Sequence, residues 1–207
     1  MGGASTDIAP MPSRPRFDEF AFGLSWVIAE PLQRTSHALL DGDRVWLIDP
    51  VNEASALERA LALGEPAGVI QLLDRHKRDC AELAARLEVP HLTPFDHPSA
   101  GPFEVVSVLR LPLWKEVALW WPATRTLVVA EAVGTNPAWA AGAGPAGIHP
   151  FLRIRPPRKL STFIPEHLLV GHGLGVHGSQ ASSALQEAFA RSRRDLPRLL
   201  LKLPSMR

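Results

Sequence analysis

The chain of 207 residues is 46% hydrophobic and 21% charged, with a formal net charge of +1. These values are typical of a globular domain, and the small net charge gives no overall bias towards nucleic acid or membranes. A single cysteine excludes an internal disulfide, and no apolar run is long enough for a membrane span. Nothing between Met1 and Phe17 resembles a signal peptide, so we expect a cytoplasmic protein.

The N-terminal residues 1–16 mix Gly, Pro and Ser without apolar periodicity, which predicts a mobile tail. The remaining residues, 17–207, suffice for one domain with its own core, and we expect a single domain. Strands are predicted over residues 22–29 and 37–49, and the second is interrupted by Asp41, Gly42 and Asp43, which suit a hairpin turn. Residues 54–63 have helical spacing and end before Gly64.

The middle of the chain is rich in predicted strands. A short strand over residues 68–73 leads through a charged turn into an amphipathic helix over residues 81–87. Further strands are predicted over residues 104–111, 116–121 and 126–133. Residues 134–150 are small residues and prolines that predict a loop, and the sequence leaves open whether this loop closes over a cleft.

The C-terminal part contains a predicted strand over residues 167–173 and a helical pattern over residues 182–203, with Pro197 as a break. Strands and helices alternate, which predicts an α/β chain with mixed sheets and helices packed outside them. The last helix is basic but has no interleaved aromatic residues beyond Phe189, so we expect no nucleic-acid partner, and no membrane partner either.

Four stretches, in chain order, carry a resemblance to a known family: SHALLDGDRVWLIDP, LLDRHKRDCAELAARLEVPHLTP, TRTLVVAEAV and HLLVGHG. They resemble the opening hairpin, the metal loop with its helix, a later acidic strand end and the closing Gly-His-Gly of the metallo-β-lactamase superfamily. The resemblance extends from about Phe22 to the C-terminal helix. It implies an αββα sandwich, in which two mixed β-sheets pack face to face between outer helices.

The resemblance places the three ligands of the family's first metal site on Arg75, on Lys77 and near Trp114. A guanidinium, a protonated ammonium and an indole N–H offer no lone pair to a metal ion. The resemblance therefore implies a degenerate metal centre that has lost two-metal hydrolysis. Trp114 is expected to cap part of the former site.

The family's second metal site falls on Asp79, Cys80, Glu131 and His172. Carboxylate, thiolate and imidazole groups can all bind zinc or a related ion, although Glu131 is one methylene longer than the family's aspartate. The resemblance therefore leaves open a mononuclear metal-dependent hydrolase with one zinc, iron or manganese ion.

The preferred hypothesis from the sequence is a site filled by a cation and without a metal cofactor. Lys77 is the simplest candidate to neutralise Asp79 and Glu131, because an uncompensated acidic cluster in a cleft is costly. In this hypothesis the remodelled cleft binds a small-molecule or protein ligand. His76 is expected to be exposed. A register shifted by one residue would make His76 a ligand, but Asp79 would then lose its place, so this alternative is not preferred.

Cys80 supports a third, minor hypothesis. Its place near the first turn of a helix and near several cations predicts a lowered thiol pKa and a reactive thiolate. The alternative is a small buried side chain, which is the commoner role of a free cysteine.

Overall fold

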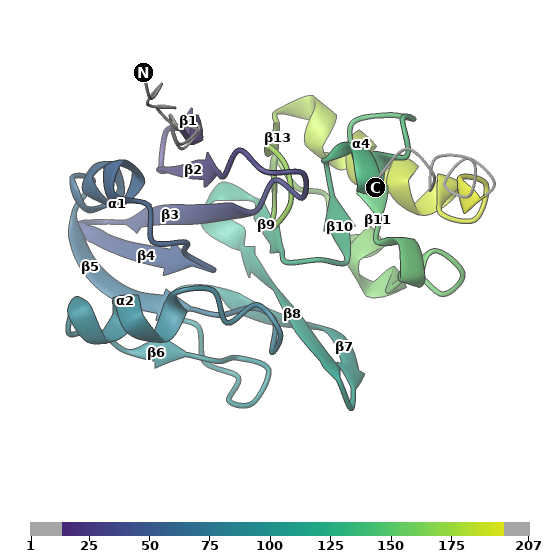
Figure 1. Ribbon diagram of the computed structural model, residues 1–207. Helices are drawn as coiled ribbons and strands as arrows, with labels where there is room; N and C mark the ends of the chain where they lie inside the picture. Colours follow the sequence, from purple (N-terminus) through teal and green to yellow (C-terminus); the bar gives the residue numbers. More distant parts are fainter. Residues whose placement is uncertain (1–13, 197–207) are drawn as a thin grey trace, which may run out of the picture.

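The computed structural model describes residues 14–196, whose strands form two main sheets (Figure 1). The first sheet has six strands in sequence order; the first four are antiparallel, and β4, β5 and β6 run parallel to one another. Its strands are β1 (Arg16–Phe20), β2 (Gly23–Val27), β3 (Thr35–Asp41), β4 (Arg44–Ile48), β5 (Glu65–Ile70) and β6 (His91–Leu92).

The second sheet has five strands in the order β13, β12, β9, β8, β7. The neighbours β9 and β12 are parallel, and the other pairs are antiparallel. The strands are β7 (Glu104–Leu111), β8 (Trp114–Trp121), β9 (Thr126–Val129), β12 (His167–Val170) and β13 (Val176–His177). A one-turn 3-10 helix, η1 (Pro122–Thr124), joins β8 to β9.

Helices cover the outer faces of both sheets (Figure 1). The helices α1 (Ala54–Leu61) and α2 (Cys80–Arg86) share a hydrophobic cluster with the first sheet, while α4 (Ser179–Arg191) packs with the second sheet. The layers therefore run helix, sheet, sheet, helix. This order confirms the αββα architecture that the resemblance implied.

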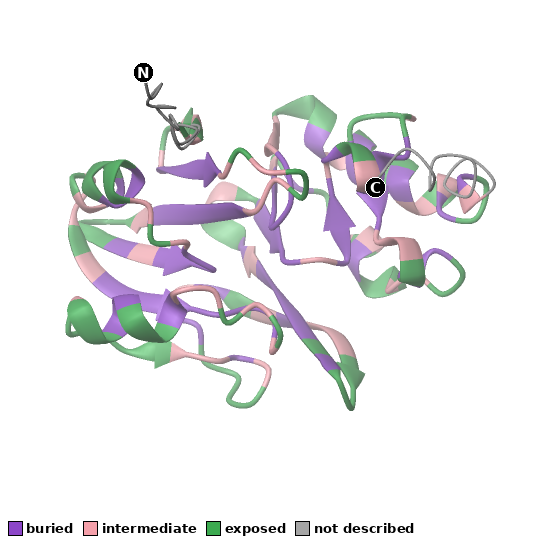
Figure 2. Ribbon diagram, in the orientation of Figure 1, coloured by how far each residue is buried: buried purple, intermediate pink, exposed green. Residues whose placement is uncertain are grey.

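The strand period of two separates the core into its layers. In β3, Ala38 belongs to the cluster under α1 and α2, whereas Leu39 belongs to the cluster between the sheets, with Leu119 and Leu127. Figure 2 shows buried residues along the facing strands and exposed ones at the hairpin tips. Burial of each large aliphatic side chain contributes roughly 1.5–3 kcal/mol.

Several predicted elements are confirmed. The hairpin between β3 and β4 closes with Asp41 paired to Arg44, and Gly42 adopts a φ of 64°, which a tight turn of this kind needs. Helix α1 begins at Ala54 as predicted, where the side chain of Glu53 accepts a hydrogen bond from the Ala56 N–H (2.7 Å).

Other boundaries differ from the prediction. Residues 16–20 form the edge strand β1. The sequence predicted a tail up to residue 16 and no strand before residue 22. Helix α4 begins at Ser179, before the predicted residue 182. The rest of the predicted tail, residues 1–13, and the predicted break at Pro197 lie outside the described residues. The division into one domain stays a prediction.

The predicted loop over residues 134–150 is the largest correction, because this segment is packed against the core. It contains a two-stranded sheet, β10 (Val133–Gly134) and β11 (Gly147–Ile148), around the short helix α3 (Pro137–Ala140). Asn136 caps that helix by accepting a hydrogen bond from the Trp139 N–H (2.9 Å). Two 3-10 helices follow, η2 (Pro150–Leu152) and η3 (Arg158–Thr162). In residues 14–196, no helix is long and apolar enough to cross a membrane.

Candidate metal centre

The loop that follows β5 is held by a carboxylate and a guanidinium. Asp49, directly after β4, accepts a hydrogen bond from the Leu72 N–H (3.0 Å). The guanidinium of Arg78 donates to the backbone carbonyls of Thr35, of Asp49 (2.7 Å) and of Gly171 (3.0 Å). Because Thr35 begins β3 and Gly171 follows β12, Arg78 ties this loop to both sheets.

Three side chains with metal-binding atoms meet beside this loop: His76 from the loop, Glu131 after β9 and His172 after β12. One such atom of each residue lies within 4.8 Å of the other two. Nε2 of His76 is 2.8 Å from Oε1 of Glu131. The parallel pairing of β9 with β12 brings Glu131 and His172 together, because both follow the carboxyl ends of neighbouring strands.

His172 is oriented for metal binding. Its Nδ1 lies 2.9 Å from the backbone carbonyl of Leu32, so the proton is placed on Nδ1 and the lone pair on Nε2. Nε2 is buried and has no hydrogen-bond partner among the described residues. Burial lowers the pKa of His172 to about 4, which leaves the imidazole neutral at pH 7. A neutral ring with a free, buried nitrogen fits a metal ion.

An aromatic ring covers His172. The indole of Trp139, in α3, stacks on the imidazole with ring centroids 4.7 Å apart and planes 15° apart. The indole N–H donates to the backbone carbonyl of Glu131 (2.7 Å). The segment predicted as a loop therefore forms one wall of the site.

His76 lies between two carboxylates. Its Nδ1 is 3.8 Å from Oδ2 of Asp49, on the side opposite Glu131. Burial alone lowers the pKa of His76, but the carboxylates of Asp49 and Glu131 outweigh burial and raise it. Burial opposes the charge of Glu131, yet His76 and then Arg75 lower its pKa to about 2. Without a metal ion, the group is thus a paired carboxylate and imidazolium.

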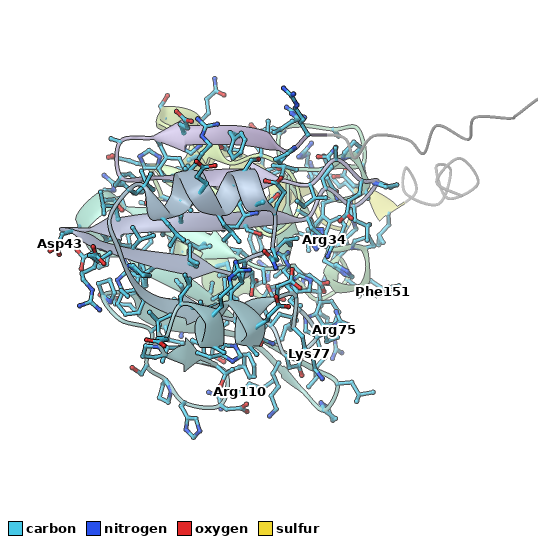
Figure 3. The ribbon with its side chains drawn as sticks, turned by 60° about the vertical axis from the view of Figure 1, so that its left-hand side comes forward. Arg34, Asp43, Arg75, Lys77, Arg110 and Phe151 are labelled. Carbon is cyan, nitrogen blue, oxygen red and sulfur yellow. The ribbon has the colours of Figure 1, made fainter. Side chains whose placement is uncertain are left out.

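Arg75 covers the group from the solvent side. Its Nη2 donates to Oε2 of Glu131 (2.5 Å), and its guanidinium lies 4.1 Å from the ring centroid of Trp114. In Figure 3, Arg75 and Lys77 lie on the same side of the molecule, away from Asp43. Lys77 is exposed, and the described residues include no ion pair of its side chain. The prediction that Lys77 neutralises the site is therefore wrong, because Arg75 and His76 are the cations that contact Glu131.

A buried carboxylate, that of Glu116, holds the backbone on which Glu131 lies. Oε1 of Glu116, in β8, accepts hydrogen bonds from the backbone N–H groups of Glu131 (2.9 Å) and Ala132 (2.8 Å). Its Oε2 accepts a hydrogen bond from the Trp114 indole (3.1 Å). Burial raises the pKa of Glu116 to about 7 despite these three donors. Through its two backbone hydrogen bonds, Glu116 thus fixes the position of the main chain at Glu131.

Several solved structures have a similar fold. The DIM-1 metallo-β-lactamase is 12% identical, with a TM-score of 0.58 over 87% of this chain and 97% of that chain. The metallo-β-lactamase from Pontibacter korlensis is 10% identical, with a TM-score of 0.59 over 86% of this chain and 99% of that chain. The metallo-β-lactamase from Erythrobacter litoralis is 8% identical, with a TM-score of 0.53 over 86% and 93% of the two chains.

The chain has the metallo-β-lactamase fold. This result confirms the fold that the four sequence stretches implied. No protein-family model matches the sequence, and a comparison with curated proteins gave no match. The likeness therefore establishes the fold alone, and the chemistry has to be argued from the side chains.

Within the metallo-β-lactamase fold, the structure brings together two of the four predicted second-site residues, Glu131 and His172. Asp79 lies at the start of α2, where its Oδ2 accepts a hydrogen bond from the Asn52 N–H (2.7 Å). Cys80 is fully buried in the cluster under α1 and α2. Neither belongs to the group of three donors in the described part of the chain.

The structure also decides two further expectations. Burial raises the pKa of the Cys80 thiol, so the predicted reactive thiolate is wrong. His76 is not exposed as predicted, since only 12% of its side chain is accessible. His76 corresponds to the alternative register, in which it becomes a donor and Asp79 loses its place, and which the sequence analysis did not favour. Trp114 is buried and packs beside the site, where the resemblance placed it.

Proposed function

We propose that this protein binds one divalent transition-metal ion through His76, Glu131 and His172 and acts as a mononuclear metal-dependent hydrolase. The observation that carries the proposal is the buried Nε2 of His172, which has no partner among the described residues and belongs to the group of three donors. Burying such an acceptor unpaired is costly, and a metal ion would satisfy it.

The donor set supports a catalytic site over a structural one. Structural zinc sites use four protein ligands, whereas catalytic sites use three, such as two histidines and a glutamate, and leave a position open. Two histidines and one carboxylate also suit iron or manganese. A bound ion of this kind supplies a water molecule of lowered pKa for attack on an electrophilic substrate. The fold, shared with metallo-β-lactamases, favours hydrolysis by analogy.

The surrounding residues each have a task in this proposal. The Leu32 carbonyl fixes the tautomer of His172, and Asp49 faces the second nitrogen of His76. Glu116 holds the backbone of Glu131, so this carboxylate keeps its position when His76 is released from it. Arg75 contacts Oε2 of Glu131 and leaves Oε1 on the side of the histidines.

Bound metal per chain tests the proposal. We expect about one zinc, iron or manganese ion per wild-type chain after dialysis against trace metals, measured by plasma mass spectrometry on protein without a histidine tag. His172→Ala should lose the ion, because it removes one of three ligands, while the exposed residue in His97→Ala serves as the matched control. Asp79→Asn should retain it, since Asp79 lies outside the group.

A second candidate function is the one expected from the sequence: a metal-free scaffold whose remodelled cleft binds a small molecule or a protein. The contact of Arg75 with Glu131 at 2.5 Å favours it, because this ion pair neutralises the carboxylate without a metal. Absence of stoichiometric metal in the wild-type protein would contradict our proposal and support this alternative. Metal lost on Asp79→Asn would instead favour the ligand set that the sequence indicated.

A further inference from the structure

The surface next to the three donors combines two cations with aromatic rings. We define the site mouth as Arg75, Lys77, Trp114, His149 and Phe151. Ring contacts link three of these residues, with centroids 4.8 Å apart for Trp114 and His149 and 5.4 Å apart for His149 and Phe151. Arg75 lies over Trp114 at 4.1 Å. Figure 3 shows Arg75, Lys77 and Phe151 on one side of the molecule.

Both cations have N–H donors that are not used in hydrogen bonds with the described residues. A guanidinium has five N–H donors. Arg75 gives one of its nitrogens to Glu131, and its other nitrogens make no hydrogen bond with the described residues. Its side chain is 43% exposed, so part of it is accessible to a ligand from solvent. The Lys77 ammonium is exposed and likewise unpaired in the described part of the chain. Glu131, the acidic group next to Arg75, is already occupied by Arg75 and His76. Asp79 and Glu82, which line a hollow with Lys77, accept hydrogen bonds from Asn52.

The rings beside these cations carry no positive charge at neutral pH. Burial lowers the pKa of His149 to about 4, and its imidazole packs against Trp114 and Trp139. Phe151 is 84% exposed, and its ring lies against His149. The site mouth is therefore cationic on the side of Arg75 and apolar on the side of Phe151.

We propose that the site mouth binds an oxyanion, a carboxylate or a phosphate, that carries a planar apolar group. Arg75 takes the oxyanion with its free guanidinium edge, which matches two oxygens at once, and Lys77 adds a second positive charge. The planar group packs on Phe151 and His149. The proposal rests on the proposed function in one respect: it places this ligand beside the three donors, where a bond of the ligand would be hydrolysed.

The chemistry of the mouth argues against other ligands. A cationic ligand meets two positive side chains and a carboxylate whose oxygens both have partners. A neutral aromatic ligand leaves the free edge of Arg75 without a partner. A small anion such as inorganic phosphate satisfies Arg75 but leaves Phe151 uncovered. A ring that bears an oxyanion satisfies both parts.

Calorimetric titration of the full chain at low ionic strength tests the proposal, since salt screens exposed charges. The probes are phenyl phosphate, benzoate, inorganic phosphate and the neutral benzyl alcohol. The variants are Arg75→Met, Phe151→Ser and the control Arg110→Met, which alters an exposed arginine on β7. Thermal unfolding of each variant establishes that it is folded, and its metal content is measured in the same samples.

We expect Arg75→Met to weaken binding of phenyl phosphate or benzoate by about tenfold or more, because a charge-assisted contact is lost. Phe151→Ser should weaken binding of these ring-bearing probes and leave inorganic phosphate unchanged, and Arg110→Met should change neither. The probe that binds more tightly, phenyl phosphate or benzoate, identifies the oxyanion as phosphate or carboxylate.

Unchanged affinity in Arg75→Met, or benzyl alcohol binding as tightly as phenyl phosphate, overturns the inference whether or not metal is bound. Arg75-dependent anion binding by a protein without metal supports the inference while contradicting the proposed function. The two failures are therefore distinguishable in one set of samples.

Discussion

Glu116 holds three parts of the candidate site with one buried carboxyl group. Its oxygens accept hydrogen bonds from two backbone N–H groups at Glu131 and Ala132 and from the Trp114 indole. Water cannot replace these contacts, since the side chain is fully buried. The position of Glu131 thus depends on a residue that never contacts a ligand.

The raised pKa of Glu116, about 7, predicts a pH-dependent stability. Its unfolded pKa is near 4.5, so between pH 4.5 and 7 the folded state binds more protons than the unfolded state. The contribution of Glu116 is therefore present below about pH 4.5 and lost as the pH rises to about 7, by up to about 1.4 kcal/mol per pH unit. Relative to Glu116→Gln, the wild-type protein should lose free energy of unfolding across this window.

Urea denaturation at several pH values, with a chelator present, measures this difference. The amide that Glu116→Gln introduces keeps an oxygen for the two backbone N–H groups but does not titrate. Parallel stability curves for the two proteins would contradict the prediction. They would mean that the three hydrogen bonds keep the carboxylate ionised despite its burial.

At the residue scale, the sequence predicted part of the candidate site. Glu131 and His172 follow strands, and strand ends are positions that the apolar pattern locates well. His76 was discounted as a ligand because its direction depends on the irregular loop, in which Arg78 has a φ of 41° and donates to three carbonyls. No periodicity reveals such a turn. The site assignments for Asp79 and Cys80 stay tied to the resemblance.

At the scale of elements, the segment from β10 to β11 changes the character of the site. In this segment Trp139 stacks on His172. The pairing of β10 with β11 places Gly147 close to α3. A Cβ atom at Gly147 would lie 1.8 Å from the backbone oxygen of Trp139, so any larger residue has to displace α3. The sequence predicted a loop here because small residues lack a strong apolar period, although many of them are buried.

Gly147→Ala should therefore destabilise the protein by roughly 1–3 kcal/mol and expose His172. The displaced α3 takes the Trp139 indole away from the imidazole, so His172 should react faster with diethyl pyrocarbonate. Mass spectrometry of the modified peptide measures that rate. Ala143→Ser, in the same segment but half-buried, is the matched control. Equal modification rates in both variants would show that Trp139 stays in place.

The hairpin of β3 and β4 and the start of α1 were predicted well for local reasons. A glycine at the turn and a capping acid before the helix act within a few residues, so the sequence alone contains the signal. The strand β1 had no such signal, because it pairs at the sheet edge and is held by distant contacts such as those of Asp18 and Phe20 with His177 of β13. Contacts between distant parts of the chain decided that element.

On the scale of the whole molecule, backbone bridges join the two sheets at the site. Arg34 pairs with His172, and Leu73 pairs with Glu116, as isolated bridges apart from the regular strand pairs. The first bridge includes the Thr35 N–H donating to the Gly171 carbonyl (2.9 Å). The second includes the Val117 N–H donating to the Leu72 carbonyl (3.0 Å). The order of elements predicted mixed sheets with outer helices and the resemblance implied the αββα fold, whereas neither indicated these bridges.

Hydrogen exchange should be slow at the backbone bridges that join the two sheets. The amides of Thr35 and Val117 should exchange only in global unfolding, because each is buried and bonded across the sheets. The tip of the β7–β8 hairpin, where Leu113 is 83% exposed, should exchange orders of magnitude faster. Exchange mass spectrometry measures both. Fast exchange at Thr35 and Val117 would show that the sheets separate near the site.

Because the two bridges fasten the sheets to each other near the site, we expect any motion of one sheet relative to the other to be a rotation about the line that joins them. In any such breathing motion, the displacement of an atom grows with its distance from that axis. His172 belongs to one bridge, and the backbone of Glu131 is held by Glu116 of the other, so motions that widen the remote end of the sandwich should change the spacing of the three donors very little. We therefore expect the distances among His76, Glu131 and His172 to vary less than those between the sheets far from the bridges.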